Sequence, residues 1–327
     1  MGNLIEGRDN PSLNPAQNKI DWGRFFGGRR ALLAYALIPT ILFFTVFWIY
    51  PLGVGFIRSF TDWSPMSVRA PEYIGLENYE RALSDRQIGI AIGNSVKFAI
   101  FTVGLRLALA LPLAILLTNL WRGRSFFRLV YFLPVVTSVI AAGVIWRFLY
   151  LPRNGVLNTI LLLVQQVLGV SFDLPRYLQD PNLALLSIGV MSVWRWLGFV
   201  IVLLMAGLSS IPVEFYEAAR IDGASRFQLF RRITLPLLRP TLVFVLVTEI
   251  ASELQVFTEA FVMVSRGSGT SLGGPANSTL TIVMLFYQSA FRNFEFGYAS
   301  TIAVIIFVIV ATFSIVQLWL GRRRWEY

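Results

Sequence analysis

The chain has 327 residues, of which 56% are hydrophobic and 14% are charged, and its mean hydropathy is +0.65. This composition excludes an ordinary soluble domain, and several apolar runs exceed the roughly 18 residues that indicate a membrane-spanning helix. The net charge of +10 lies in short segments between apolar runs, which is typical of cytoplasmic loops and not of a nucleic-acid surface. The chain lacks cysteine and histidine, which argues against disulfides, Cys-ligated metal sites and histidine-based catalysis.

Residues 1–30 form a polar segment that the charge pattern assigns to the cytoplasm. Trp22, Phe25 and Phe26 lie beside several arginines, which predicts a helix on the membrane surface. The first apolar run follows at 31–50, and no small-residue cleavage site comes after it, so we expect a retained anchor. Residues 31–327 are expected to form a single integral membrane domain.

Five further apolar runs are long enough to span a membrane, at 94–118, 126–150, 182–208, 241–264 and 298–320. The run at 156–170 is too short to span, which predicts a helix on or in the outer leaflet. The link after the second span, the loop 209–240 and the C-terminus are basic, whereas loops 52–91 and 151–181 are acidic or balanced. The sequence therefore predicts an all-α membrane protein with six transmembrane helices and both termini in the cytoplasm.

The most polar loop, between the fourth and fifth predicted spans, has the pattern of two short helices. Ser210 can cap the first helix, Pro212 and Glu214 suit its first turn, and Gly223 suits its end. Ser225 can cap the second helix, which Pro236 is expected to end.

One face of the first predicted helix has little bulk, because helical spacing brings together Phe215, Ala218, Ala219 and Asp222. Small side chains allow another protein to approach closely. The alternative is an ordinary connection between two membrane helices.

Four charged residues of the predicted spans form a candidate polar site: Arg106, Arg195, Glu249 and Glu253. At about 1.5 Å per residue, Glu249 and Glu253 lie roughly 14 and 20 Å deep in a core about 30 Å thick, and the two arginines lie near mid-depth. Such groups usually face the bundle interior, a cavity or one another.

Two interpretations of these charges stay open. The carboxylates, with Ser252 on the same helix, could accept hydrogen bonds from a sugar, on which Trp194, Trp196 or Tyr287 could stack. Alternatively the charges form ion pairs that hold helices together. Glycosidase chemistry is disfavoured, because paired catalytic carboxylates need a concave, water-accessible scaffold.

Seven residues of the same loop resemble a motif of the permease subunits of bacterial binding-protein-dependent ABC importers. The motif is Glu-Ala-Ala, three residues, Gly, nine residues, Ile, one residue and Leu-Pro. Its positions are held by Glu217, Ala218, Ala219, Gly223, Ile233, Leu235 and Pro236. Further segments resemble the maltose-transporter-like carbohydrate branch, at 50–51, 59–60, 75–79, 133–134, 146–148, 155–158, 206–212, 273–275 and 296–299.

The resemblance implies a non-catalytic subunit of a larger assembly. A second permease would complete the pathway for a sugar or oligosaccharide, two ATPase subunits would bind ATP and Mg²⁺, and an extracytoplasmic binding protein would deliver the solute. The loop would dock on an ATPase through the seven motif residues together with Phe215 and Asp222. The chain has no phosphate-binding Gly-x-x-x-x-Gly-Lys-Ser/Thr loop, so we expect no cofactor, metal or catalytic residue on this chain.

Other functions remain as alternatives. Related permeases share these motifs, so the solute could be a polyol or a glycerol-phosphate-type compound. A stand-alone secondary transporter is disfavoured, because it needs no docking loop. A polytopic membrane enzyme is disfavoured by the absence of Cys, His and any metal-binding cluster.

Overall fold

A computed structural model describes residues 28–120, 122–264 and 272–321, and within them the secondary structure is helical, with one isolated β-bridge between Thr61 and Tyr73. The chain divides into two compact units, at 1–54 and 55–327. The all-helical part of the predicted fold class is confirmed for the described residues.

The described part of the first unit is a single helical run. It contains α2 (Gly28–Phe44), a π-helical turn (Thr45–Ile49) and the beginning of α3 (Tyr50–Arg58). A stretch of 24 residues, Tyr35–Arg58, is long and apolar enough to cross a membrane. It overlaps the predicted first span and extends it beyond residue 50. The predicted surface helix lies before Gly28, outside the described residues.

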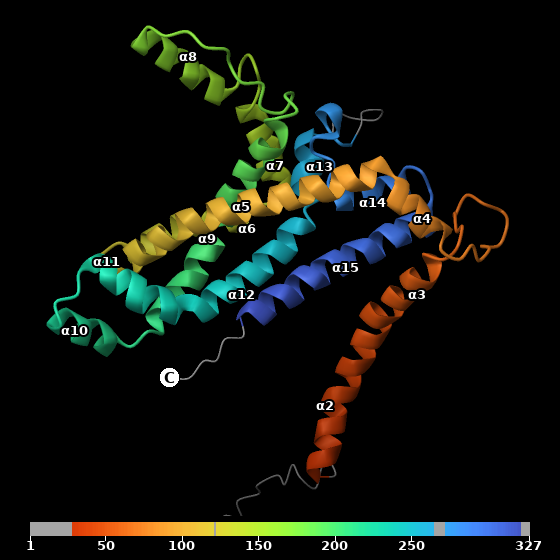
Figure 1. Cartoon of the computed structure of the whole chain (residues 1–327), viewed down its shortest axis with the longest axis horizontal. Helices are drawn as coiled ribbons and strands as arrows, with labels where there is room; N and C mark the ends of the chain where they lie inside the picture. Colours follow the sequence, from red (N-terminus) through yellow and green to blue (C-terminus); the bar gives the residue numbers. More distant parts are fainter. Residues whose placement is uncertain (1–27, 121, 265–271, 322–327) are drawn as a thin grey trace, which may run out of the picture. The chain divides into compact units, whose positions relative to one another are not determined.

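The second unit is built on four long helices that pack side by side (Figure 1). These are α5 (Arg86–Asn119), α9 (Ala184–Ser209), α12 (Leu235–Leu254) and α15 (Phe296–Gly321). Small residues on α5, such as Ala110 and Ala114, are fully buried and allow close contact with Leu204 and Met205 of α9. Close packing of apolar side chains thus holds the bundle together.

The predicted third span is not one straight helix. The chain forms α6 (Arg124–Val136) and α7 (Val139–Leu149), which meet at 95°. Pro134 removes a backbone donor near the end of α6, and Thr137 leaves the helical conformation with ψ 138°. The described residues therefore contain five helices able to span a membrane, or six if this bent pair counts as one span.

The predicted fifth span is also shorter than expected. Its helix ends at Leu254, and a separate helix, α13 (Thr258–Val264), follows after a break. The structure also contains a helix that is not among the predicted elements, α14 (Ile282–Phe291), which is short and apolar and packs on α15. The short run at 156–170 is confirmed as a helix, α8 (Val156–Leu168).

The end of the bundle where α15 begins brings together three segments of the family resemblance, at 59–60, 75–79 and 296–299. Asn78 of α4 (Glu77–Ser84) donates hydrogen bonds to the carbonyls of Ser59 and Thr61, at 3.0 and 2.9 Å. The amide of Gly297 donates to the Trp63 carbonyl at 2.8 Å. A Cβ atom on Gly297 would collide with the Thr61 carbonyl, so this contact requires glycine.

Candidate functional site

The loop between α9 and α12 begins with a short helix, α10 (Val213–Ile221), whose end has a specific backbone geometry. Gly223 has φ +79°, and the amide of Ala224 donates to the Ala219 carbonyl at 2.9 Å. The Gly223 amide donates to the backbone carbonyl of Arg220 at 3.0 Å, and the two hydrogen bonds together form a Schellman motif. The predicted helix stop at Gly223 is confirmed. A Cβ atom here would meet nothing within 4 Å, so glycine is required for its backbone conformation and not for space.

The predicted cap at the other end of α10 is wrong. The hydroxyl of Ser210 donates to the Gly207 carbonyl at 2.8 Å, because Ser210 lies at the end of α9. Pro212 occupies the N-cap position and makes no side-chain cap. Glu214 does lie in the first turn, where a negative charge is favourable.

The second predicted helix begins as expected and does not end as expected. Ser225 and Gln228 form a reciprocal capping box at the start of α11 (Arg226–Leu229). The chain then passes through a π-helical turn, Phe230–Thr234, directly into α12. Pro236 does not end this helix, because the Leu235 amide bonds five residues back to Phe230 and the proline falls in the first turn of α12.

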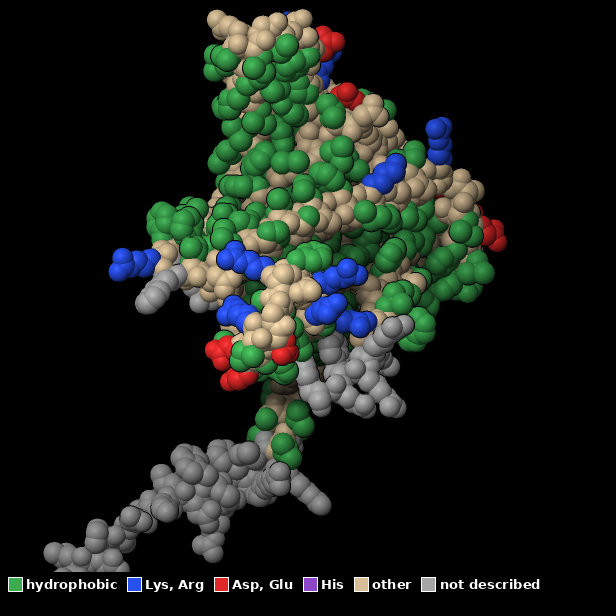
Figure 2. Space-filling view, turned by 60° about the vertical axis from the view of Figure 1, so that its left-hand side comes forward, with side chains coloured by type: hydrophobic (Ala, Val, Ile, Leu, Met, Phe, Trp, Pro, Cys, Tyr) green, Lys and Arg blue, Asp and Glu red, His purple; other side chains and the backbone are tan. Residues whose placement is uncertain are grey.

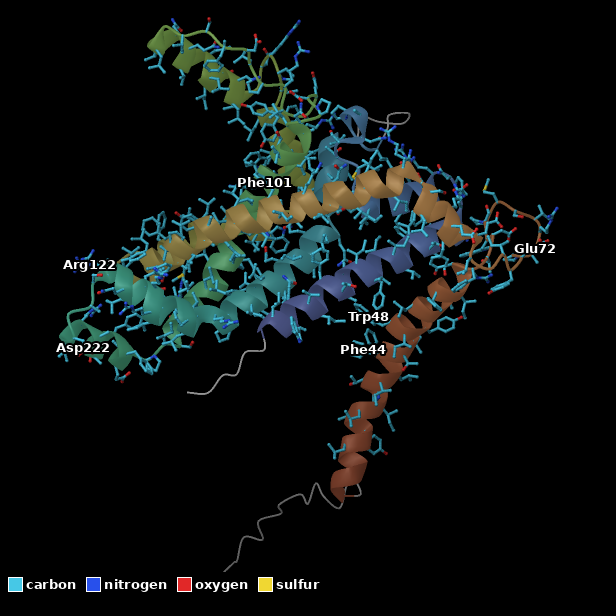
Figure 3. The ribbon with its side chains drawn as sticks, viewed as in Figure 1. Phe44, Trp48, Glu72, Phe101, Arg122 and Asp222 are labelled. Carbon is cyan, nitrogen blue, oxygen red and sulfur yellow. The ribbon has the colours of Figure 1, made fainter. Side chains whose placement is uncertain are left out.

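The helix α10 has two different faces. Val213, Tyr216 and Arg220 line a groove against the bundle. Phe215, Ala218 and Asp222 are exposed on the other side, and Glu217 is exposed between the two faces. The hydroxyls of Tyr216 and Thr234 lie 3.1 Å apart and connect α10 to the returning helix. Asp222 and Arg122 both lie at this end of the molecule (Figure 3).

The other motif residues are distributed between the two arms of the loop. Ala219 is half-buried on α10, and Gly223 is exposed at its end. Ile233 is half-buried in the π-helical turn, whereas Leu235 and Pro236 are exposed at the start of α12. The seven motif residues thus belong to one folded loop, although only the first three of them lie on α10 itself.

Arg106, Glu249 and Glu253 form one buried cluster between three helices. A nitrogen of Arg106 on α5 lies 2.6 Å from a carboxylate oxygen of Glu253 on α12, and another pairs with Glu249. Ser192 of α9 accepts a hydrogen bond from Arg106 at 3.0 Å and donates one to Glu253 at 3.3 Å. The four residues are between 1% and 7% exposed. The cluster connects α5, α9 and α12 away from solvent.

Arg195 belongs to a second, separate pair. Its guanidinium lies 3.6 Å from a carboxylate oxygen of Glu259 on α13 and 4.7 Å from the centre of the Trp196 ring. It also donates to the Thr137 carbonyl at 3.5 Å, at the break between α6 and α7. Glu259 is not among the predicted residues, although it falls inside the predicted fifth span, where the same rule on buried charges applies to it.

The remaining candidate residues lie apart from the carboxylates. Ser252 is exposed on α12, so it does not share the buried face of Glu249 and Glu253. Trp194 is 40% exposed, and its ring centre lies 5.6 Å from that of Trp146 on α7. Tyr287 packs against Phe257, which precedes α13, Phe261 of α13 and Phe291 of α14. The structure therefore does not bring the eight candidate residues, four charged residues with Ser252 and three aromatic residues, into one site.

Comparison with known proteins identifies the family. Residues 107–326 match the family described as binding-protein-dependent transport system inner membrane component. The chain is 34% identical over 298 residues to the trehalose/maltose transport system permease protein of Thermococcus litoralis, covering 90% of this chain and 96% of the relative. It is 31% identical over 308 residues to the arabinooligosaccharides transport system permease protein of Bacillus subtilis, covering 94% and 93%.

A solved structure has the same fold. It is a chain of a bacterial ABC transporter involved in the import of the acidic polysaccharide alginate, with a TM-score of 0.76 at 22% identity. The alignment covers 93% of this chain and 99% of the other. Because the family match covers most of the chain and both relatives align over nearly their full length, this chain belongs to the family of binding-protein-dependent transport system inner membrane components.

Proposed function

We propose that this chain is the permease subunit of an ATP-driven importer of a sugar or an oligosaccharide. The observation that carries the proposal is the alignment, over nearly the whole of each chain, with two relatives named for carbohydrate transport. The family is an inner membrane component, and the described residues include several apolar helices. The chain is accordingly a multi-pass protein of the cytoplasmic membrane, and a binding protein delivers its solute.

The proposed topology has six spans, with the α6–α7 pair as one span and both termini in the cytoplasm. It is supported by the basic side chains that gather around α10 and α11 (Figure 2). Exposed arginines at this end are Arg122, Arg220, Arg226, Arg231, Arg232 and Arg239. An excess of arginine is typical of cytoplasmic loops. Residues 1–30 are then a cytoplasmic segment before the permease domain, 31–327.

The proposed partner of α10 is an ATPase subunit, which binds ATP and Mg²⁺. Support comes from the exposed face of α10, where Phe215 offers an anchor and Ala218 offers little bulk. A second permease completes the pathway. This chain has a transport role. It changes conformation when the docked ATPase moves α10.

The pathway is proposed to run along the exposed sides of α9 and α12. Thr248 and Ser252 of α12 form an exposed polar stripe with Gln255, which caps the end of this helix, at i, i+4 and i+7. Polar side chains inside a membrane usually face a cavity or another protein and not lipid. Trp194 is exposed on α9 and offers an aromatic face to a sugar ring. The buried carboxylates fasten the helices behind this surface.

The function is tested by transport in reconstituted vesicles. The assembled transporter with its binding protein should accumulate a labelled maltose-type or arabinose-type oligosaccharide only when ATP is supplied on the side of the ATPases. Uptake of a polyol or glycerol phosphate in preference to every saccharide would favour the alternative solute class. Uptake driven by an ion gradient without ATP would contradict the importer assignment and favour a secondary transporter.

A second measurement tests the proposed pathway surface. Trp194→Ala should raise the apparent KM for uptake by about tenfold, because it removes an aromatic stacking surface worth about 1.4 kcal/mol. The matched control is Leu186→Ala, because Leu186 is 42% exposed two turns earlier on the same helix face. Equal KM values for the two variants would remove Trp194 from the pathway.

A further inference from the structure

A large groove lies between the loop helices and the ends of α5 and α9. Its volume is about 970 Å³, which is within the usual range for small-molecule sites. Leu111, Ile115 and Leu116 of α5 form one wall, and Leu229 of α11 contributes to the opposite side. The side chains of these four residues are apolar, so the groove offers a surface that favours hydrocarbon over water.

The mouth of this groove is basic. Arg220 of α10 and Arg226 at the start of α11 both line it, and both are exposed. Among the described residues that line the groove, none is acidic. Glu214 and Glu217 of α10 and Asp222, which caps its end, are not among the lining residues. A negatively charged group at the mouth would therefore meet two guanidinium groups.

The groove is distinct from the proposed ATPase-docking surface. The residues of α10 that line the groove are Val213, Tyr216 and Arg220, at i, i+3 and i+7. Phe215 and Ala218 are on the opposite side of the helix. An occupant of the groove can therefore contact α10 while its other face is docked.

We propose that this groove binds an anionic phospholipid of the inner leaflet, with its phosphate between Arg220 and Arg226 and its acyl chains along α5. This inference rests on the proposed topology, which places α10 in the cytoplasm. From Leu111 to Asn119, at the end of α5, the helix rises about 12 Å, so the apolar wall extends from the headgroup region into the hydrocarbon layer. Basic pockets between membrane helices on the cytoplasmic side are suited to anionic headgroups.

The long apolar wall favours a lipid over a free phosphate ion. A phosphate ion would use the arginines alone, whereas a phospholipid also removes the exposed surface of Leu116 from water. The bound lipid would brace α10 against the bundle, beside the Tyr216–Thr234 hydrogen bond. The lipid thus supports the helix through which the ATPases are proposed to act.

Lipid retention by the assembled transporter tests the proposal. The complex is purified from nanodiscs that contain phosphatidylcholine and phosphatidylglycerol, and the phospholipid retained by each complex is measured by native mass spectrometry. Wild type should retain phosphatidylglycerol. The Arg220→Gln/Arg226→Gln variant should bind it on the order of thirty-fold more weakly, since each arginine near an anionic headgroup contributes about fivefold.

Two controls separate this site from general attraction to basic residues. Arg231→Gln/Arg232→Gln removes two exposed arginines that do not line the groove and should retain phosphatidylglycerol normally. Ile115→Trp fills the groove without a change of charge and should release the lipid, whereas Leu109→Trp, at an exposed position of α5 outside the groove, should not. Co-purification of the partner subunits establishes that each variant assembles.

Other outcomes would overturn the proposal. Equal loss in the two arginine pairs would indicate nonspecific attraction, and unchanged retention in Ile115→Trp would place the lipid elsewhere. Displacement of the lipid by inorganic phosphate alone would indicate a phosphate site. A transporter that imports its sugar but retains no phosphatidylglycerol would refute the lipid site and leave the proposed function intact. Lipid retention without ATP-driven uptake would contradict the proposed function instead.

Discussion

Arg106→Leu is expected to prevent most of the permease from assembling stably. The change leaves Glu249 and Glu253, which are 7% and 4% exposed, without their shared cationic partner. Removal of one member of a buried ion pair costs about 3–5 kcal/mol, because the remaining charge is buried and uncompensated. The measurement is the yield of the assembled complex in the membrane and its thermal unfolding midpoint after purification.

A neutral version of the same cluster is the control for this prediction. The triple variant Arg106→Leu/Glu249→Gln/Glu253→Gln removes all three charges and should recover most of the lost stability, since no unpaired charge remains. Normal assembly of Arg106→Leu alone would show that water or another group compensates the carboxylates. In that case the cluster would not be a structural element of the bundle.

Glu253→Gln distinguishes the two interpretations of the buried carboxylates. Glutamine can still bond to Ser192 and Arg106, so this variant should assemble. If the cluster only fastens helices, the apparent KM for uptake stays at the wild-type value, which is the result we expect from its burial. A changed KM in a fully assembled complex would return Glu253 to the solute pathway.

Gly223→Val is expected to lower uptake by tenfold or more. Gly223 has φ +79°, and a β-branched residue is strained in this conformation by about 1–2 kcal/mol or more. Since a Cβ atom would meet nothing within 4 Å, the effect arises from the backbone and changes the direction in which α10 ends. Gly223→Asn is the matched control, because asparagine tolerates the left-handed conformation and should retain much of the activity.

The contact surface of α10 is tested separately by Ala218→Trp. Ala218 is exposed on this chain, so the permease should fold normally while the bulky ring prevents close approach of an ATPase. ATPase subunits that co-purify with the permease should decrease strongly. Leu83→Trp, at a position 90% exposed on α4, provides a control at the other end of the bundle. Equal ATPase recovery from both variants would show that docking uses another surface.

Local sequence patterns predict the helical class, the position of most long helices and the loop that contains the family motif. These features follow from local causes, namely the length of apolar runs, the placement of arginine and the conformation that Gly223 permits. The stop at Gly223 and the cap at Ser225 could be predicted because each depends on residues within one helical turn.

The pairing of the buried charges depends instead on tertiary packing. Arg106 and Arg195 lie at similar predicted depths, yet Arg106 takes both Glu249 and Glu253, whereas Arg195 pairs with Glu259. The choice depends on how α5, α9, α12 and α13 are rotated against one another, which hydropathy does not encode. The break between α6 and α7 and the continuation of α12 through Pro236 were missed for a related reason. A proline permits a bend or a first helical turn, and packing against the neighbouring helices determines which of the two occurs.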